Sequence, residues 1–191
     1  MRRAFAPLAA AALLAGCGIN SVPTAEEEAK AQWANVQAAY QRRADLIPNL
    51  VATVRAASRA ENETLTNVIN ARARATQIQV SPDELTDAGK VQQFAAAQSA
   101  LSVALRPVVQ ETYPQLRSQE GFLRLQDQLE GTENRITNAV RDYNVAVQAY
   151  NTRIRTFPDA IGARVIHGAQ PLTPFQAVTP GAERAPQVDF S

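Results

Sequence analysis

The sequence predicts an all-α protein, an elongated antiparallel four-helix bundle with kinked helices and an extended C-terminal tail. Three observations lead to this fold class. Large apolar residues recur every seven positions between residues 122 and 157, capping signals precede three other amphipathic segments, and no segment alternates apolar and polar residues as a half-buried strand does. Amphipathic helices joined by short connections pack most simply as antiparallel neighbours.

The first expected helix begins at the run Thr24-Ala-Glu-Glu27, which matches a capping box. One apolar stripe then runs along it, formed by Trp33, Val36, Tyr40, Ile47, Leu50 and Val54. Pro48 lies inside this pattern and cannot donate a backbone hydrogen bond to the carbonyl of Ala44. We therefore expect a bend or a local break near residues 44 to 48.

Two shorter helices are expected next. A second capping box at Ser58–Glu61 opens a helix that extends to about Ile78. The run Ser81-Pro82-Asp83-Glu84 opens a third helix, which reaches Val108 and should be kinked by Pro107. The pair Tyr113-Pro114 disfavours its continuation.

The longest expected helix extends from Phe122 to Phe157, about 54 Å at the usual rise per residue. Six residues spaced by seven form its stripe: Phe122, Leu129, Ile136, Tyr143, Tyr150 and Phe157. Gly131 inside it costs about 1 kcal/mol. From residue 158 onward the chain holds five of its eleven prolines, which predicts an extended tail that either wraps the bundle or stays mobile.

The N-terminus has the pattern of a lipoprotein signal. Arg2 and Arg3 precede an eleven-residue apolar stretch that ends in Leu14-Ala-Gly-Cys17, a run similar to a bacterial lipobox. Eleven helical residues reach about 16 Å, too short for a spanning helix. We expect a signal peptide at 1–16, lipid attachment at Cys17, a tether at 17–30, a helical bundle at 31–157 and a proline-rich tail at 158–191. The alternative is an ordinary secreted protein with a free thiol.

Composition gives little support for catalysis or for nucleic-acid binding. The chain carries 19 basic and 18 acidic residues, so it has no excess of positive charge that would favour nucleic-acid binding. His167 is the single histidine, Cys17 is the single cysteine, and no Glu-x-x-His pair or glycine-rich phosphate loop occurs. We therefore expect no metal, no cofactor and no catalytic residues.

Charged residues on two helices are candidates for a polar site. Asp127, Glu130 and Glu133 could place carboxylates along one helix face, which is more typical of a solvated surface than of acid–base catalysis. Arg43 lies within the apolar stripe of the first helix. The simpler expectation is that its stem packs while its guanidinium reaches water. The alternative is a partly buried ion pair with Glu133 or Glu130 that fixes helix register.

A Tyr-Asn pair occurs twice, one heptad apart. Tyr143 and Tyr150 lie on the apolar stripe, where they are most simply core residues, while Asn144 and Asn151 flank it and could bond to a neighbouring helix. The functional alternative is a ligand site between helices at these residues.

Several motifs follow one another in a specific order. They are Arg42–Val51 (RRADLIPNLV), Tyr113-Pro114, Phe122–Gln126 (FLRLQ), Leu129–Ile136 (LEGTENRI), the two Tyr-Asn pairs, Phe157-Pro158 and Ala185–Phe190 (APQVDF). In order and spacing they resemble the LemA family over about residues 30 to 190. Three polar residues of the two long motifs complete a candidate interaction cluster with Arg43, Glu130, Glu133 and the Tyr-Asn pairs: Asp45, Asn49 and Asn134.

The resemblance implies a membrane-attached, all-α protein and carries over no catalytic residues. Many family members resemble single-pass membrane proteins, whereas this chain begins with the shorter, lipobox-like segment. We expect a non-catalytic scaffold, adaptor or modulator of another envelope protein, with a membrane protease or a TPM-domain protein as the partner that the family suggests. Gly18 after the cysteine is compatible with the outer membrane of a Gram-negative cell. The alternatives are a lipid or small-molecule binder near Tyr143 and Tyr150, and a hydrolase built on Glu130, Glu133 and Arg43.

Overall fold

The computed structural model describes residues 20–57, 62–110 and 120–177, and within these ranges it is all-α, which confirms the predicted class. The elements are α2 (Ser21–Ala57), α3 (Asn62–Gln77), a single 3-10 turn η1 (Pro82–Glu84), α4 (Ala88–Gln110), α5 (Glu120–Arg153) and α6 (Asp159–Val165). No strand occurs in the described ranges.

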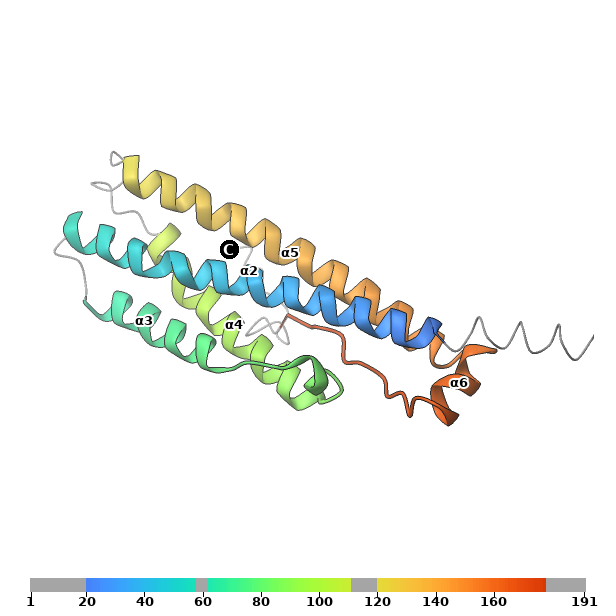
Figure 1. Cartoon of the computed structure of the whole chain (residues 1–191). Helices are drawn as coiled ribbons and strands as arrows, with labels where there is room; N and C mark the ends of the chain where they lie inside the picture. Colours follow the sequence, from blue (N-terminus) through green and yellow to red (C-terminus); the bar gives the residue numbers. More distant parts are fainter. Residues whose placement is uncertain (1–19, 58–61, 111–119, 178–191) are drawn as a thin grey trace, which may run out of the picture.

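Two long helices form the body of an elongated bundle. Figure 1 shows α2 and α5 side by side along most of their length and running in opposite directions. The shorter helices α3 and α4 pack against each other and lie beside α2, whereas α6 packs near the N-terminal end of α2. In the described part of the chain, none of these helices combines the length and the apolarity needed to cross a bilayer.

The interior divides into two apolar clusters along the length of the bundle. The first lies where the N-terminal half of α2 meets the C-terminal half of α5, and it contains most of the buried rings. The second lies between the C-terminal half of α2, α3, the C-terminal half of α4 and the start of α5. Tyr40 and Ile136 belong to the first cluster, and Ile47 and Leu129 to the second. The residues that separate the clusters are therefore those around position 43 of α2.

The first helix differs from the sequence-based expectation at two points. It begins at Ser21 rather than at Thr24, whose hydroxyl donates a 2.7 Å hydrogen bond to the carbonyl of Asn20, the residue just before the helix. It also continues without a break through Pro48. The carbonyl of Ala44, which Pro48 leaves without its helical donor, accepts a 2.7 Å hydrogen bond from Nε of Arg72 on α3. A side chain from a neighbouring helix thus satisfies the backbone group that a break would have exposed to water.

The capping signal at Ser81 forms, but it opens η1 rather than α4. The Glu84 carboxylate accepts a 2.9 Å hydrogen bond from the Ser81 amide, as a capping box requires. The start of α4 is capped instead by Asp87, whose Oδ1 accepts from the amides of Gly89 at 2.9 Å and Lys90 at 3.2 Å. Helix α4 continues through Pro107. The predicted signals at Ser58–Glu61 and Tyr113-Pro114 lie outside the described residues.

The prediction that the longest helix reaches Phe157 is wrong. Helix α5 ends at Arg153, and the chain then turns, with amides at 155 and 156 bonded to carbonyls only three residues back. Ile154 is still buried, but Phe157 is 82 % exposed. The tail then forms α6, which the sequence did not predict, and after a turn at 166–167 residues 168–177 run extended along the bundle. Of the two alternatives for the tail, wrapping of the bundle is the one observed for residues 168–177.

Candidate functional site

A buried arginine separates the two apolar clusters. Arg43 is only 1 % exposed, and its guanidinium donates to Oε1 of Glu133 at 2.9 Å, to the Ser102 hydroxyl at 2.6 Å, and to the carbonyl and side-chain oxygens of Gln98 at 3.0 Å each. The expectation that this group reaches water is therefore wrong, and the alternative of an ion pair with Glu133 is confirmed. The acceptors come from α4 and α5, so Arg43 links three helices at one level of the bundle.

The surroundings of Arg43 explain how a charge is tolerated there. Gln98 also donates to the carbonyl of Ala75 on α3 at 3.1 Å, and the Tyr40 ring centre lies 5.0 Å from the guanidinium carbon. Nε of Arg43 has no hydrogen-bond partner among the described residues. Because the side chain of Glu133 is 51 % exposed, water screens part of the pair. That the pair fixes the register of the helices stays a prediction.

Burial also alters the acidity of Tyr40, which packs beside this arginine. Removal of the phenol from water is the largest effect and raises the pKa of Tyr40 to about 12, although the nearby Arg43 charge opposes the rise. Tyr40 therefore stays neutral at physiological pH and is poorly suited to act as a base. Tyr40 and Gln98 line a cavity of about 290 Å³, which Glu133 does not line.

The remaining charged candidates do not converge on the arginine. Glu130 is exposed and is approached only by the Gln126 amide at 3.5 Å, on its own helix. Asp45 is exposed and accepts a 2.7 Å hydrogen bond from Gln41. Asn49 and Asn134 are also exposed. Of the predicted cluster, the structure thus brings together Arg43 and Glu133 but leaves these four residues on the surface.

The two Tyr-Asn pairs hold the C-terminal tail instead of a ligand. The Asn151 side chain donates to the carbonyl of Leu172 at 2.8 Å and accepts from its amide at 2.9 Å. Asn144 makes the same pair of bonds with the backbone of Phe175, at 2.9 and 2.8 Å. Each asparagine therefore replaces the hydrogen-bonding partner that a neighbouring strand would supply. The expected partner was a helix, and the observed partner is the extended tail.

Further contacts seat the same stretch of tail. The Tyr143 hydroxyl donates to the carbonyl of Thr173 at 2.8 Å, and the Thr173 amide donates to the carbonyl of Leu85 at 2.9 Å. Burial raises the pKa of the Tyr143 phenol above its ordinary value, so it remains a donor. These bonds place residues 172–175 between α5 and the turn after η1.

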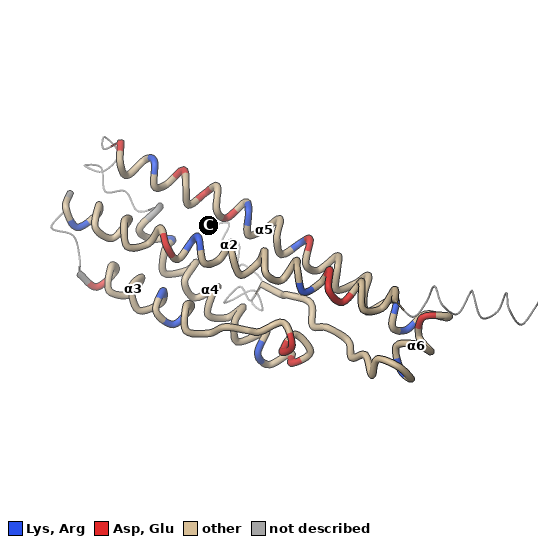
Figure 2. Tube along the Cα trace, viewed as in Figure 1, with Lys and Arg blue, Asp and Glu red and all other residues tan. Residues whose placement is uncertain are grey.

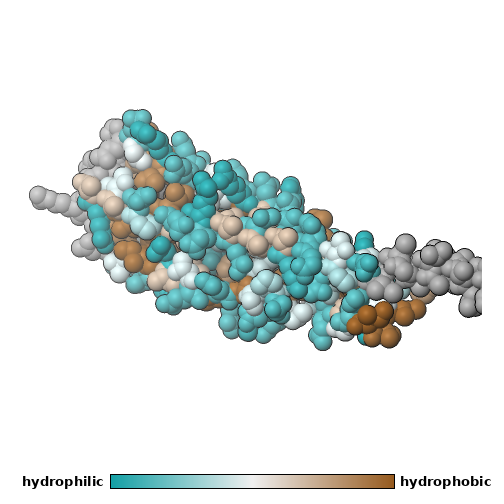
Figure 3. Space-filling model, in the orientation of Figure 1, coloured by the Kyte–Doolittle hydropathy of each residue, from teal (hydrophilic) through white to brown (hydrophobic). Residues whose placement is uncertain are grey.

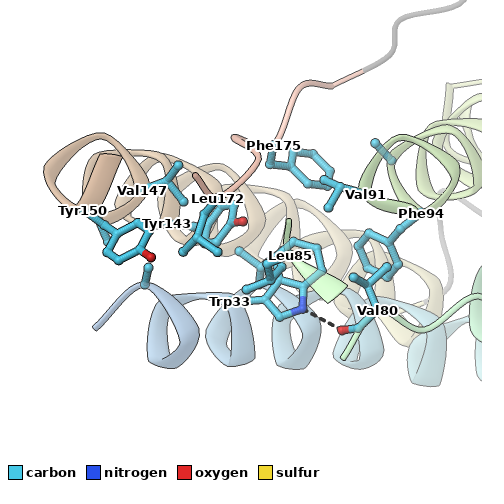
Figure 4. Packing of buried hydrophobic residues seen from close by; sticks show 14 of the residues in the cluster. Trp33, Val80, Leu85, Val91, Phe94, Tyr143, Val147, Tyr150, Leu172 and Phe175 are labelled. Atoms are coloured by element: carbon cyan, nitrogen blue, oxygen red, sulfur yellow. Dashed lines mark hydrogen bonds between the residues drawn. The ribbon is translucent and has the colours of Figure 1, made fainter. Parts of the chain in front are cut away.

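Two tail side chains fill the space where a ligand was considered. Leu172 and Phe175 are each 4 % exposed, and Figure 4 shows them beside Tyr143 and Trp33. The ring centres of Trp33 and Phe175 are 6.3 Å apart, and the Trp33 indole N–H donates to the carbonyl of Val80 at 2.9 Å. The interhelical space near Tyr143 and Tyr150 is thus occupied by the protein's own chain.

An open apolar groove lies elsewhere, between α3 and α4. Its volume is about 580 Å³, and it is lined mainly by small and apolar side chains, among them Ala71, Ala96, Ala97, Ala100, Val103 and Ala104. Neither Glu130 nor Glu133 lines it. The sequence signal that could have indicated it is the alanine-rich run from residue 95 to 104, which offers little bulk to fill the space between helices.

Metal binding finds no support in the described ranges, where no group of three or more histidine, cysteine, aspartate or glutamate side chains could hold an ion. Cys17, the expected lipid-attachment residue, lies outside the described residues, as do the expected signal peptide and residues 178–191.

Comparison with known proteins gives a consistent family assignment. The sequence profile described as the LemA family matches residues 32–190. A curated relative, Protein LemA of Metamycoplasma hominis, is 27 % identical over 125 residues, which cover 64 % of this chain and 52 % of that protein. The chain therefore spans about half the length of the curated relative that it matches.

Proposed function

The chain belongs to the LemA family, and on that premise we propose that it is a non-catalytic, lipid-anchored protein of the bacterial cell envelope that acts as a scaffold or adaptor for another envelope protein. The observation that carries the proposal is that the polar groups of the interior are used by the fold itself. Arg43 links helices, and Asn144 and Asn151 hold the tail. Most of the hydrogen-bonding capacity of these groups is therefore used within the fold, and Nε of Arg43 is the one of their donors that is buried without a partner among the described residues.

Anchoring through Cys17 would place the bundle at a membrane surface. Cys17 lies only four residues before Ser21, where α2 begins. Two or three acyl chains on this cysteine would give stable attachment, since a single chain binds only marginally. Gly18 would be compatible with the outer membrane in a Gram-negative cell.

The face that supports a contact role is formed by α3 and α4. Between Lys90 and Arg106 helix α4 carries no charged residue, whereas Arg74 of α3 lines the groove. Figure 2 shows charged residues on α3 as well as along α2 and α5. The groove on this face is about 580 Å³ and Val103 at its edge is 46 % exposed. The proposed occupant of this groove is an apolar helix of an envelope partner, because small residues let the backbone of another helix approach closely. A membrane protease or a TPM-domain protein is the partner class that the family suggests.

Site-specific photo-crosslinking in intact cells tests this role. A photoreactive residue replaces Val103 in the groove, and a matched control replaces Asn138, which is exposed on α5 and does not line the groove. The proposal expects one discrete adduct from position 103, weak or no adduct from position 138, and loss of the adduct when Cys17→Ser removes the anchor. Equal, diffuse labelling from both positions would contradict it.

The groove also supports a second candidate function, the binding of a lipid chain or another apolar small molecule. Its volume is within the range of small-molecule sites. Extraction of the purified protein with organic solvent, followed by mass spectrometry, distinguishes the two. A stoichiometric apolar molecule that disappears in Val103→Glu but persists in Asn138→Glu would favour the binder. For the hydrolase alternative, Glu130 and Glu133 line neither the α3–α4 groove nor the smaller cavity beside Tyr40, so no observation favours it.

A further inference from the structure

A compact apolar patch covers the end of the bundle formed by α6 and its flanks. Four large side chains there are strongly exposed: Phe157 at 82 %, Ile161 at 59 %, Val165 at 79 % and Ile166 at 57 %. Figure 3 shows this hydrophobic patch over α6, apart from the more mixed surface of the bundle. Single exposed apolar residues are ordinary, but a contiguous group at one end of a molecule marks a contact surface.

The patch results from how α6 is seated. Ala163 is 1 % exposed and packs into the first apolar cluster. Ile161 is two residues earlier, about 200° around the helix axis, and Val165 is on the same outer side one turn later. Because the small Ala163 faces the core, the large apolar residues face away from it. Burial within this chain's described residues therefore does not explain them.

The position of α6 identifies what the patch meets. The Ser21 hydroxyl donates to the Asp159 carboxylate at 2.8 Å, and the Arg153 guanidinium donates to the Ser21 carbonyl at 3.3 Å. These bonds fasten α6 to the first residue of α2. The chain between Cys17 and Ser21 can span at most about 14 Å. A lipid on Cys17 would therefore hold a bilayer within reach of the patch.

The charges around the patch fit an anionic bilayer surface. Residues 153–167 contain three arginines and one carboxylate. That carboxylate, Asp159, is engaged by Ser21 and lies 3.9 Å from Arg153. Arg155 and Arg164 are exposed beside the apolar side chains. Apolar groups that enter the headgroup region, with basic groups at their edge, are the usual composition of an interfacial membrane contact.

We propose that the α6 patch, formed by Phe157, Ile161, Val165 and Ile166, inserts into the interfacial region of the bilayer that carries the lipid anchor, and so holds this end of the bundle against the membrane. The inference rests on the proposed lipid anchoring. It adds a second contact, which turns a flexible tether into an oriented attachment with the far end of α5 directed away from the surface.

Spin-label depth measurements on the lipidated protein test the proposal. With Cys17 acylated, the variants Ile161→Cys and Val165→Cys each provide a single free thiol for a nitroxide. The matched control is Leu123→Cys, which is 43 % exposed on α5 and about 45 Å along that helix from Arg153. The labelled proteins are reconstituted in vesicles of phosphatidylethanolamine and phosphatidylglycerol, and the collision rates of each label with oxygen and with a water-soluble nickel complex are compared.

The expected result is that labels at 161 and 165 collide preferentially with oxygen, as in a bilayer, while the label at 123 collides preferentially with nickel. A second pair of variants keeps the label at position 165 and changes the apolar surface instead. Ile161→Asp should shift a label at 165 to the nickel-accessible class, whereas Val145→Asp, at an apolar residue of α5 that is 60 % exposed, should not.

Two results would refute the proposed membrane contact of the α6 patch without refuting the lipid anchoring. Vesicle flotation of the lipidated protein with a nickel-accessible label at 165 would show that the patch stays in water. A label shielded from both reagents would show that another part of the chain or a second protein covers it. Failure of the lipidated protein to float with vesicles would refute the anchoring proposal, and the patch contact with it.

Discussion

The tail clamp made by Asn151 gives a prediction whose size follows from the structure. Replacement by alanine removes two hydrogen bonds to the backbone of Leu172, at 2.8 and 2.9 Å. At about 1 kcal/mol net for each bond, opening of the tail becomes easier by about 2 kcal/mol, or about 30-fold. Native-state hydrogen exchange of the Thr173 amide measures this opening, because that amide donates to the Leu85 carbonyl and keeps its acceptor in the variant.

Two comparisons make the measurement specific. Asn144→Ala should speed exchange of the same Thr173 amide by a similar factor, because it removes the equivalent pair of bonds to Phe175. Asn138→Ala, at an exposed asparagine of the same helix, should leave the Thr173 amide protected. Unchanged exchange at Thr173 in the Asn151→Ala protein would refute the reasoning, since the tail would then be held by packing alone.

Three further predictions concern the bundle. Arg43→Met and Glu133→Gln should be coupled by about 1 kcal/mol in a double-mutant cycle of urea unfolding, because either substitution alone already breaks the 2.9 Å ion pair. Additive changes in the free energy of unfolding would show that the pair contributes nothing to stability. Arg72→Met should lower the free energy of unfolding by about 1 kcal/mol in the natural chain. In Pro48→Ala the loss should be smaller, because the amide of the new alanine can donate to the Ala44 carbonyl in place of Arg72. Equal losses in both backgrounds would contradict the role given to Arg72. The pKa of Tyr40 is raised to about 12 in the folded protein from a usual 10.0, so the unfolded chain loses this proton first. Tyr40 should therefore lower the free energy of unfolding between pH 10 and 12 by up to about 1.4 kcal/mol per pH unit, and Tyr40→Phe should reduce the slope measured in pH-dependent unfolding by that contribution, while the raised pKa of Tyr143 keeps part of the slope.

The all-helical bundle was predictable because periodicity reports the buried face of each helix. Phe122, Leu129, Ile136, Tyr143 and Tyr150 are all buried on α5, at the expected spacing. The pattern did not identify where the helix ends, because an apolar residue at the right interval is not evidence that the backbone stays helical. Phe157 matches the stripe in sequence, yet it lies beyond a turn and faces outward.

Helix boundaries were less predictable because local signals compete with tertiary contacts. Ser81 has the chemistry of an N-cap and uses it, but on a single turn that ends before α4 begins. Pro48 would break an isolated helix, whereas here Arg72 from α3 satisfies the backbone group it leaves open. No rule based on neighbouring residues in the sequence can anticipate a donor from 28 positions away.

For the polar candidates too, the sequence identified the residues but not the partners that they contact. Arg43 was identified because a charge interrupted an apolar stripe, but the choice between water and burial depended on Ser102 and Gln98, which come from a different helix. Asn144 and Asn151 were identified by their repeat, although their partner is a proline-rich tail that has no periodicity to reveal its path. The α6 patch was missed because α6 itself was not predicted.

The most direct test of the account is the mass of the N-terminal peptide of the protein purified from bacterial membranes. The account predicts that this peptide begins at Cys17 and carries a thioether-linked diacylglyceryl group. A peptide with an unmodified Cys17 thiol would contradict the anchoring on which the adaptor role and the α6 contact both depend.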